Sequence, residues 1–264
     1  MQNLIAFVTL VASSEPKYWT SSAAWGQTQK LMFAVYESHA QNYNSMILFQ
    51  VSIAIGGWNE GSKKYSEMVA DADKRKNFTE SVVAFCKEHN FDGLDLDWEY
   101  PGKRGGSPDD KANFIKLVRD LKKAFRPLGL LLTAAIGAAA PTIDVAYDIP
   151  QMYKYLDYVH VMCYDYHGKW DRKTGHNAPL YSRPNEKGQD LFLNVDYTLE
   201  YLMKKGALAE KTVLGVPLYG RAFTLMNPHD HKMGARAQTT SFQVITFNDP
   251  LCHILSNFSW TSSF

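Results

Sequence analysis

Residues 91–102 read Phe-Asp-Gly-Leu-Asp-Leu-Asp-Trp-Glu-Tyr-Pro-Gly. Apolar side chains at positions 94, 96 and 98 alternate with carboxylates at Asp95, Asp97 and Glu99. A period of two predicts a β-strand, which places the three carboxylates on one face and the apolar side chains on the other. The Tyr-Pro-Gly that follows ends the strand, so Glu99 is expected at its C-terminal tip.

Three like charges on one face of a strand repel one another. Crowding of this kind separates pKa values, so that one carboxyl group stays protonated beside an ionised neighbour, as acid catalysis requires. We expect the negative neighbours of Glu99 to raise its pKa. The spacing alone is equally consistent with structural carboxylates or with metal-binding ones. Since His89, His160 and His176 do not follow a ligand spacing, we expect no metal site.

Strand and helix patterns alternate on both sides of this stretch, which indicates parallel βαβ units. In such folds the functional side chains gather at the C-terminal ends of the strands. The predicted strands are Val51–Ile55, Gly93–Asp97, Leu130–Ile136, Tyr158–Tyr164 and Thr212–Val216. The predicted helices are Ser66–His89, Asp109–Phe125 and Val195–Lys205.

Residues 91–102 resemble the D-G-x-D-x-D-W-E-Y-P signature of glycoside hydrolase family 18, the chitinases and their relatives. The resemblance implies a (β/α)8 TIM barrel whose fourth strand carries the motif. It also implies that Glu99 donates a proton to the glycosidic oxygen, and that the N-acetyl oxygen of the sugar takes the place of an enzyme nucleophile. By the same resemblance Asp97 holds the acetamido N–H, Asp95 tunes the charge of Asp97, and Tyr100 lies near the cleaved bond.

Two further stretches resemble other barrel strands of that family. Residues 52–59 resemble the end of the third strand, and the resemblance implies that Trp58 offers a stacking face to a sugar. Residues 215–223 resemble the seventh strand, with Tyr219 and Arg221 reaching the substrate. Any one such block is also consistent with ordinary core or turn residues.

A third stretch, residues 161–168, resembles the family's M-x-Y-D strand. The resemblance implies that Met162 lines the floor of the site, that Tyr164 bonds the attacking acetamido oxygen and that Asp165 binds a sugar hydroxyl. Trp170 resembles a tryptophan at the rim of the cleft.

The resemblance covers residues 51–225 and five of the eight barrel strands. We therefore expect a barrel segment over 51–235, between an N-terminal segment, 1–50, and a C-terminal tail, 236–264, that do not match the family pattern. Residues 1–14 form either a weak signal peptide or a buried strand, and the signal peptide is favoured. Alternative splicing and an imperfect gene prediction would both produce such ends.

Composition narrows the expected partners. A net charge of +1 does not indicate nucleic acid or an acidic membrane surface. Three widely spaced cysteines give no disulfide framework, and the apolar run at the N-terminus is too short to span a membrane. The family resemblance implies that the partner is chitin or a chito-oligosaccharide, bound by a monomer outside the cell and without a cofactor.

Three functions remain open on the sequence. The first is an endo-acting chitinase that cleaves β-1,4 bonds between N-acetylglucosamine units with retention. The second is a chitin-binding lectin on the same fold, although lectin relatives usually lose the glutamate or an aspartate of the motif, and this chain keeps them. The third is an inactive truncated product, because a barrel without its closing strands would leave the edges of Val51–Ile55 and Thr212–Val216 open.

Overall fold

The computed structural model describes residues 10–11, 33–38, 48–239 and 245–246. The chain forms two compact units. The first unit contains residues 1–162 and 198–215, and the second contains residues 163–197 and 216–264.

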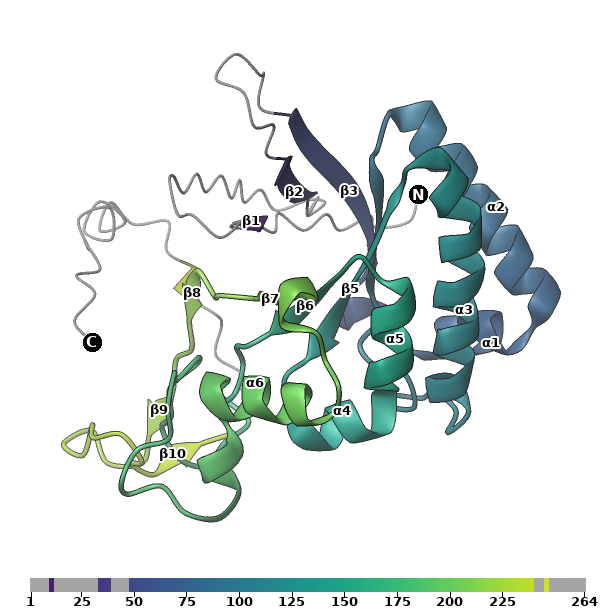
Figure 1. Ribbon diagram of the computed structural model, residues 1–264. Helices are drawn as coiled ribbons and strands as arrows, with labels where there is room; N and C mark the ends of the chain where they lie inside the picture. Colours follow the sequence, from purple (N-terminus) through teal and green to yellow (C-terminus); the bar gives the residue numbers. More distant parts are fainter. Residues whose placement is uncertain (1–9, 12–32, 39–47, 240–244, 247–264) are drawn as a thin grey trace. The chain divides into compact units, whose positions relative to one another are not determined.

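A parallel sheet forms the centre of the first unit, and its strands follow one another in chain order (Figure 1). Its strands are β3 (Leu48–Gly56), β4 (Gly93–Asp97), β5 (Leu131–Gly137), β6 (Tyr158–Met162) and β7 (Thr212–Leu214). All five predicted strands are confirmed, with small shifts at their ends. Every residue of β4 is buried, as expected for a parallel strand that is covered on both faces.

Two short strands continue the sheet beyond β3. β2 (Phe33–Ser38) pairs with β3 in the antiparallel sense, and β1 (Leu10–Val11) pairs with β2 in the parallel sense. The expectation of an open edge at β3 was therefore wrong, because the backbone groups of that edge bond to β2. At the other end β7 has only β6 as a neighbour among the described residues, so the barrel is not closed over this part of the chain.

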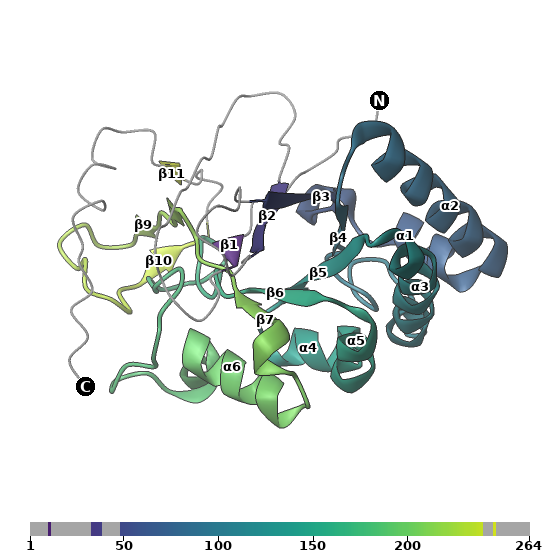
Figure 2. The ribbon, with the colours of Figure 1, turned by 45° about the horizontal axis from the view of Figure 1, so that its top comes forward.

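The helices of the first unit cover one face of this sheet (Figures 1 and 2). α3 lies at the centre of the layer and packs against α1, α2, α5 and β5. The helices are α1 (Lys63–Ala70), α2 (Ala72–His89), α3 (Asp110–Phe125), α4 (Ala140–Ala146) and α5 (Ile149–Tyr155). α4 and α5 had not been predicted.

The segment predicted as one helix over Ser66–His89 is two helices that meet at Asp71. The backbone of Asp71 is extended, and its carboxylate accepts hydrogen bonds from the backbone N–H groups of Asp73 at 2.8 Å and Lys74 at 3.0 Å. This is an N-cap, which begins α2 and separates it from α1.

The helix predicted over Asp109–Phe125 is confirmed as α3. The side chains that set its helical period are all buried: Phe114, Leu117, Val118, Leu121 and Phe125. Gly129, at a φ of 68°, ends the short 3₁₀ turn that follows the helix. Glycine adopts this left-handed conformation without steric strain.

Loops and short strands make up most of the second unit. β8 (Tyr219–Gly220) pairs with β11 (Ile245–Thr246), and β9 (Thr224–Leu225) pairs with β10 (Ala237–Gln238), both in the antiparallel sense. α6 (Val195–Lys204), as predicted, begins in the last residues of this unit's first segment, and its residues from 198 onward belong to the first unit. None of the helices described here has both the length and the apolar character needed to cross a membrane.

Candidate active site

β4 sorts its side chains to two faces as its period predicts. Trp98, directly after the strand, faces the helices, where its ring centroid lies 5.8 Å from that of Tyr65 and 6.0 Å from that of Phe114. By alternation the neighbouring carboxylates point to the opposite face. The predicted arrangement of acidic and apolar side chains is therefore present at this strand.

Asp95 is fully buried and is held by the two strands that follow β4 in the sheet. Its Oδ1 accepts a hydrogen bond from the hydroxyl of Thr133 on β5 and lies 2.9 Å from Nδ1 of His160 on β6. His160 is buried as well. The sequence singled out His160 only as a poor metal ligand, and the structure instead places it as a partner of an acidic motif residue.

Asp97 is almost completely buried, at 2% exposure. Burial raises the pKa of its carboxyl group well above the usual range, and the negative charges of Glu99 and Asp95 raise it further. Its Oδ1 has no hydrogen-bond partner among the described residues, and the same holds for the buried hydroxyl of Ser52 on β3. Asp97 therefore keeps its proton to a higher pH than an ordinary aspartate and has an oxygen free for a ligand.

Glu99 is half-buried and lies just beyond the end of β4. Two tyrosines surround the carboxylates. Burial raises the pKa of the Tyr100 hydroxyl, and the charge of Glu99 and a hydrogen bond to Glu99 raise it further. Burial also raises the pKa of Tyr147, whose hydroxyl accepts a hydrogen bond from the backbone of Gly137 at 3.3 Å. Both phenols thus stay neutral and remain hydrogen-bond donors. Tyr147 had not been predicted as a site residue.

The end of β3 passes unusually close to Asp97. A Cβ atom on Gly56 would lie 2.0 Å from the backbone oxygen of Asp97, and the φ of Gly56 is 126°, so only glycine fits there. The next residue, Gly57, donates its backbone N–H to the same oxygen at 2.7 Å. This contact brings Trp58, which is 57% exposed, to the same end of the sheet as the carboxylates.

The backbone that follows Glu99 is tied to the start of α1. The indole N–H of Trp98 donates to the hydroxyl of Ser62 at 3.0 Å, and that hydroxyl donates to the backbone oxygen of Tyr100 at 2.9 Å. The two bonds join the helix-facing side of the motif to the residue directly after Glu99.

A buried carboxylate, Asp110, organises the rest of this loop. Its Oδ2 accepts from the backbone N–H groups of Gly102 at 3.1 Å and Ser107 at 2.9 Å, and its Oδ1 accepts from the hydroxyl of Ser66 at 2.6 Å. Asp110 is also the first residue of α3, where the helix dipole favours a negative charge. Hydrogen bonds of this kind compensate for burying the carboxylate, and they fix the loop between Gly102 and Ser107.

The second unit contains a separate polar cluster around Asp165. Its carboxylate accepts from the hydroxyl of Tyr219 at 2.6 Å and from Nε of Arg221 at 2.7 Å, and a second guanidinium nitrogen contacts its other oxygen. Asn177 joins the cluster, because its side chain accepts from the backbone N–H of Asp165 at 2.9 Å and donates to the backbone oxygen of Tyr219 at 3.0 Å. Asn177 had not been predicted.

Aromatic side chains surround this cluster. The rings of Tyr164 and Tyr219 meet edge to face, with centroids 6.0 Å apart. The guanidinium carbon of Arg221 lies 5.0 Å from the ring centroid of Trp170, which is 49% exposed.

The predicted site residues thus form two groups. The first unit holds Trp58, Asp95, Asp97, Glu99, Tyr100 and Met162, and the second holds Tyr164, Asp165, Trp170, Tyr219 and Arg221.

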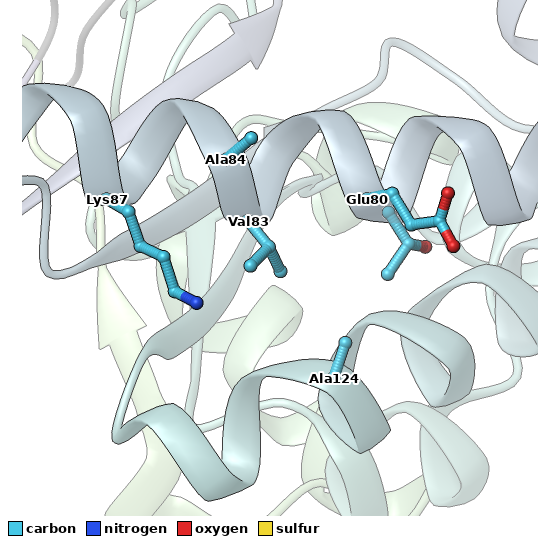
Figure 3. A pocket seen from close by; sticks show the side chains of 6 residues that line it. Glu80, Val83, Ala84, Lys87 and Ala124 are labelled. Atoms are coloured by element: carbon cyan, nitrogen blue, oxygen red, sulfur yellow. The ribbon is translucent and has the colours of Figure 1, made fainter.

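The described surface of the first unit has a groove away from the predicted site residues. A groove of about 390 Å³ lies between α2 and α3 and is lined by residues that include Glu80, Val83, Lys87 and Ala124 (Figure 3). None of the predicted site residues lines it. Among the described residues no three His, Cys, Asp or Glu side chains are grouped as ligands of a metal ion.

Comparison with known proteins assigns the chain to a family. The sequence profile of the glycosyl hydrolases family 18 matches residues 5–262, a wider range than the blocks that carry the resemblance in the sequence. The chain belongs to this family, whose fold is the (β/α)8 barrel.

Curated and solved relatives agree with this assignment. A probable chitinase 2 of Drosophila melanogaster is 46% identical over 213 residues, which are 79% of this chain and 43% of that protein. The crystal structure of the Group IV chitinase of Ostrinia furnacalis matches with a TM-score of 0.73 and 38% identity, over 78% of this chain and 59% of that one. Human YKL-39, described as a pseudo-chitinase with retained chitooligosaccharide binding, matches with a TM-score of 0.66 and 35% identity, over 71% of this chain and 52% of that one. The chain spans less than two thirds of the length of each of these relatives.

Proposed function

We propose that this chain hydrolyses β-1,4 bonds between N-acetylglucosamine units, with retention at the anomeric carbon. The observation that carries the proposal is the series of carboxyl groups that begins on β4. Asp95 is fully buried, Asp97 is nearly so and has a raised pKa, and Glu99 is half-buried in the loop. Groups of one chemical type in different environments take different protonation states, which is the requirement for acid and base catalysis.

In this proposal Glu99 is first the general acid and then the general base. The acetamido oxygen of the substrate attacks the anomeric carbon, the bond from that carbon to the glycosidic oxygen breaks, and Glu99 gives its proton to the departing oxygen. An oxazolinium-like intermediate remains, without a covalent bond to the protein. Water then adds to the anomeric carbon and gives a proton to Glu99, which restores both the acetamido group and the acid.

Asp97 supports the intermediate. Its buried Oδ1 has no partner among the described residues, so the N–H of an acetamido group would satisfy it. As positive charge develops on the intermediate, the hydrogen bond from the acetamido N–H to this oxygen becomes stronger, which lowers the barrier. Asp95, held by Thr133 and His160, is the fixed negative neighbour that tunes Asp97.

The remaining residues bind the sugar chain. Following the family resemblance, we assign Tyr164 to the attacking acetamido oxygen, and Asp165, Tyr219 and Arg221 to sugar hydroxyls. Trp170 offers an exposed aromatic face to a sugar ring.

Three groups of the first unit complete the assignment. Trp58 offers a second exposed aromatic face, Met162 the apolar floor, and Tyr100 a neutral hydroxyl next to the cleaved bond. The proposal uses no metal or cofactor, and we place the protein outside the cell as a monomer.

A second function, carbohydrate binding without turnover, has one specific observation in its favour. Human YKL-39 resembles this chain in structure and is described as a pseudo-chitinase with retained chitooligosaccharide binding. Retention of Asp95, Asp97 and Glu99 favours hydrolysis over binding alone.

Turnover of a fluorogenic N-acetylated chito-oligosaccharide by the purified chain tests the proposal. We expect hydrolysis of this substrate, no hydrolysis of the analogue deacetylated at the cleaved sugar or of a cello-oligosaccharide, and no effect of EDTA. Equal rates on the acetylated and the cellulose-type substrates would rule out the mechanism, and so would EDTA inhibition reversed by a divalent ion. Binding without turnover would identify a lectin, and neither binding nor turnover would identify an inactive product.

A further inference from the structure

Arg104 joins the loop after Glu99 to the exposed tryptophan of the first unit. Its guanidinium carbon lies over the ring of Trp58, 3.6 Å from the ring centroid, in a cation–π contact. One guanidinium nitrogen, Nη1, donates to the backbone oxygen of Trp58 at 2.7 Å and to the backbone oxygen of Glu99 at 3.1 Å. A single side chain therefore contacts the indole and two backbone groups of the candidate site.

The loop presents Arg104 in a defined position. Arg104 has a φ of 53°, in the left-handed region that non-glycine residues rarely adopt. It lies between Gly102 and Ser107, the two residues whose backbone N–H groups are fixed by the buried carboxylate of Asp110. The stack on Trp58 is thus supported by an anchored loop, although Arg104 itself is on the surface.

We propose that Arg104 is a positioning residue that holds the indole of Trp58 as a sugar platform, at a fixed place relative to the acid of the reaction. The proposal rests on the function proposed above and names the group that prepares one of its binding faces. The guanidinium covers one face of the indole, and because Trp58 is 57% exposed, the other face is available to a sugar ring.

Fixing the indole before binding reduces the conformational entropy that is lost when a sugar docks on it. The bond from Arg104 to the backbone oxygen of Glu99 sets the distance between this platform and the residue that donates the proton. The sugar that docks on Trp58 and the bond that Glu99 protonates are thereby held at a fixed separation along the sugar chain.

Arginine is better suited to this position than lysine. A guanidinium group is planar, so it lies flat on the ring while its N–H groups remain available in the plane for the two carbonyl oxygens. An ammonium group keeps the charge but does not combine a flat stack with two directed bonds. Lysine at position 104 is therefore expected to restore only part of the effect.

Binding of an N-acetylated chito-oligosaccharide, measured by calorimetry in the Glu99→Gln background, tests the proposal without interference from turnover. We expect Arg104→Met to weaken binding about three- to tenfold and Arg104→Lys to weaken it less. Arg119→Met is the matched control, because Arg119 is an exposed arginine of α3 whose guanidinium contacts Asp120 and none of the candidate site residues, and it is expected to bind as the background does.

The pair with Trp58 separates positioning from general destabilisation. If Arg104 acts through the indole, Arg104→Met adds no further loss of affinity once Trp58→Ala is present. A loss that is the same with and without Trp58 would overturn the proposal, as would unchanged binding by Arg104→Met.

A second measurement needs no sugar. The guanidinium carbon of Arg104 lies over the indole. The Nε–H proton bonded next to it is therefore expected at an upfield-shifted position in the NMR spectrum of the full chain and should return to the ordinary arginine position in Trp58→Ala. If the parent binds no oligosaccharide, the function proposed above fails, and this spectrum still decides whether Arg104 holds the indole. An Arg104 resonance that is the same with and without Trp58 would contradict the inference.

Discussion

The two units place an aspartate of the candidate site in opposite environments. Asp97 in the first unit is buried beside two other carboxylates, and its pKa is raised. Asp165 in the second unit is paired with the guanidinium of Arg221 and accepts a hydrogen bond from Tyr219. The comparison shows that one residue type serves two purposes: unpaired and crowded, it keeps its proton to a higher pH, whereas paired with a cation it orients its neighbours.

The largest effect, a loss of catalytic rate, is expected from replacing Glu99, the last carboxylate of the motif. Glu99→Gln keeps the shape of the side chain but cannot deliver a proton, so kcat on a fluorogenic chito-oligosaccharide should fall at least about 10²-fold with little change in binding. Glu67→Gln, at an exposed glutamate of α1, is the control and should leave kcat unchanged. A Glu99→Gln variant within a few-fold of the parent would show that another residue is the acid.

Stability should depend most on the buried anchor of the loop. Asp110→Ala removes the acceptor of the Gly102 N–H and of the Ser66 hydroxyl, and it leaves the Ser107 N–H only its bond to the Ser66 hydroxyl. It should lower the free energy of unfolding of the first unit by about 2–4 kcal/mol. The neighbouring Asp109 is exposed and its side chain makes no capping bond, so Asp109→Ala should change stability by less than about 0.5 kcal/mol. Denaturant unfolding of both variants measures the difference. An equal loss of stability in the two variants would contradict the role of Asp110 as the anchor of the loop.

The paired aspartate of the second unit should matter less for stability. Its side chain is 37% exposed, so solvent compensates part of what Asp165→Ala removes, and we expect a loss of about 1–2 kcal/mol. Asp230→Ala, at an exposed aspartate of the same unit, is the control. If Asp165→Ala destabilised the protein more than Asp110→Ala, the contrast between the two units would be reversed.

Because the pKa of Asp97 is raised, replacing its carboxyl group by a neutral group is expected to increase the stability of the protein by an amount that depends on pH. Aspartate in an unfolded chain titrates near about pH 3.9, and folded Asp97 keeps its proton to a higher pH. The stability that its protonated form provides is therefore complete below about pH 4, and it is lost as the pH rises through the folded pKa. Asp97→Asn stays neutral at every pH, so its melting temperature should exceed that of the parent at pH 7 by more than it does at pH 3.5. A difference that is independent of pH would mean that the charge of Asp97 is not the cause.

The smallest effect is expected on association between chains, from a substitution on β7 at the edge of the sheet. Leu214 on β7 is 42% exposed, and β7 has only β6 as a neighbour among the described residues. An apolar edge strand favours association between chains, and a lysine on such a strand opposes it. Leu214→Lys should therefore reduce the aggregated fraction in size-exclusion chromatography, and Thr224→Lys in the second unit serves as the control. A parent chain without an aggregated fraction would show that this edge does not cause association.

Local patterns in the sequence were sufficient for most of the scaffold. The five parallel strands and α3 follow from hydrophobic period and from turn residues such as Gly129, because these signals act between near neighbours in the chain. The break at Asp71 was missed although its signal is local, since an aspartate before Asp73 and Lys74 has the pattern of an N-cap. The pairing of β2 with β3 was missed because no strand had been predicted at residues 33–38, although β2 directly precedes β3 in the chain and Ser38 pairs with Leu48.

What the sequence by itself determined is the alternation that puts Asp95, Asp97 and Glu99 on one side of a strand, and with it the resemblance to the family. Only the tertiary structure decided which distant side chains meet them: His160 beside Asp95, and Arg104 over Trp58. The physical reason is that a period records the direction of a side chain relative to its own strand or helix, whereas a contact between strands depends on their register and on the packing of the loops that follow them.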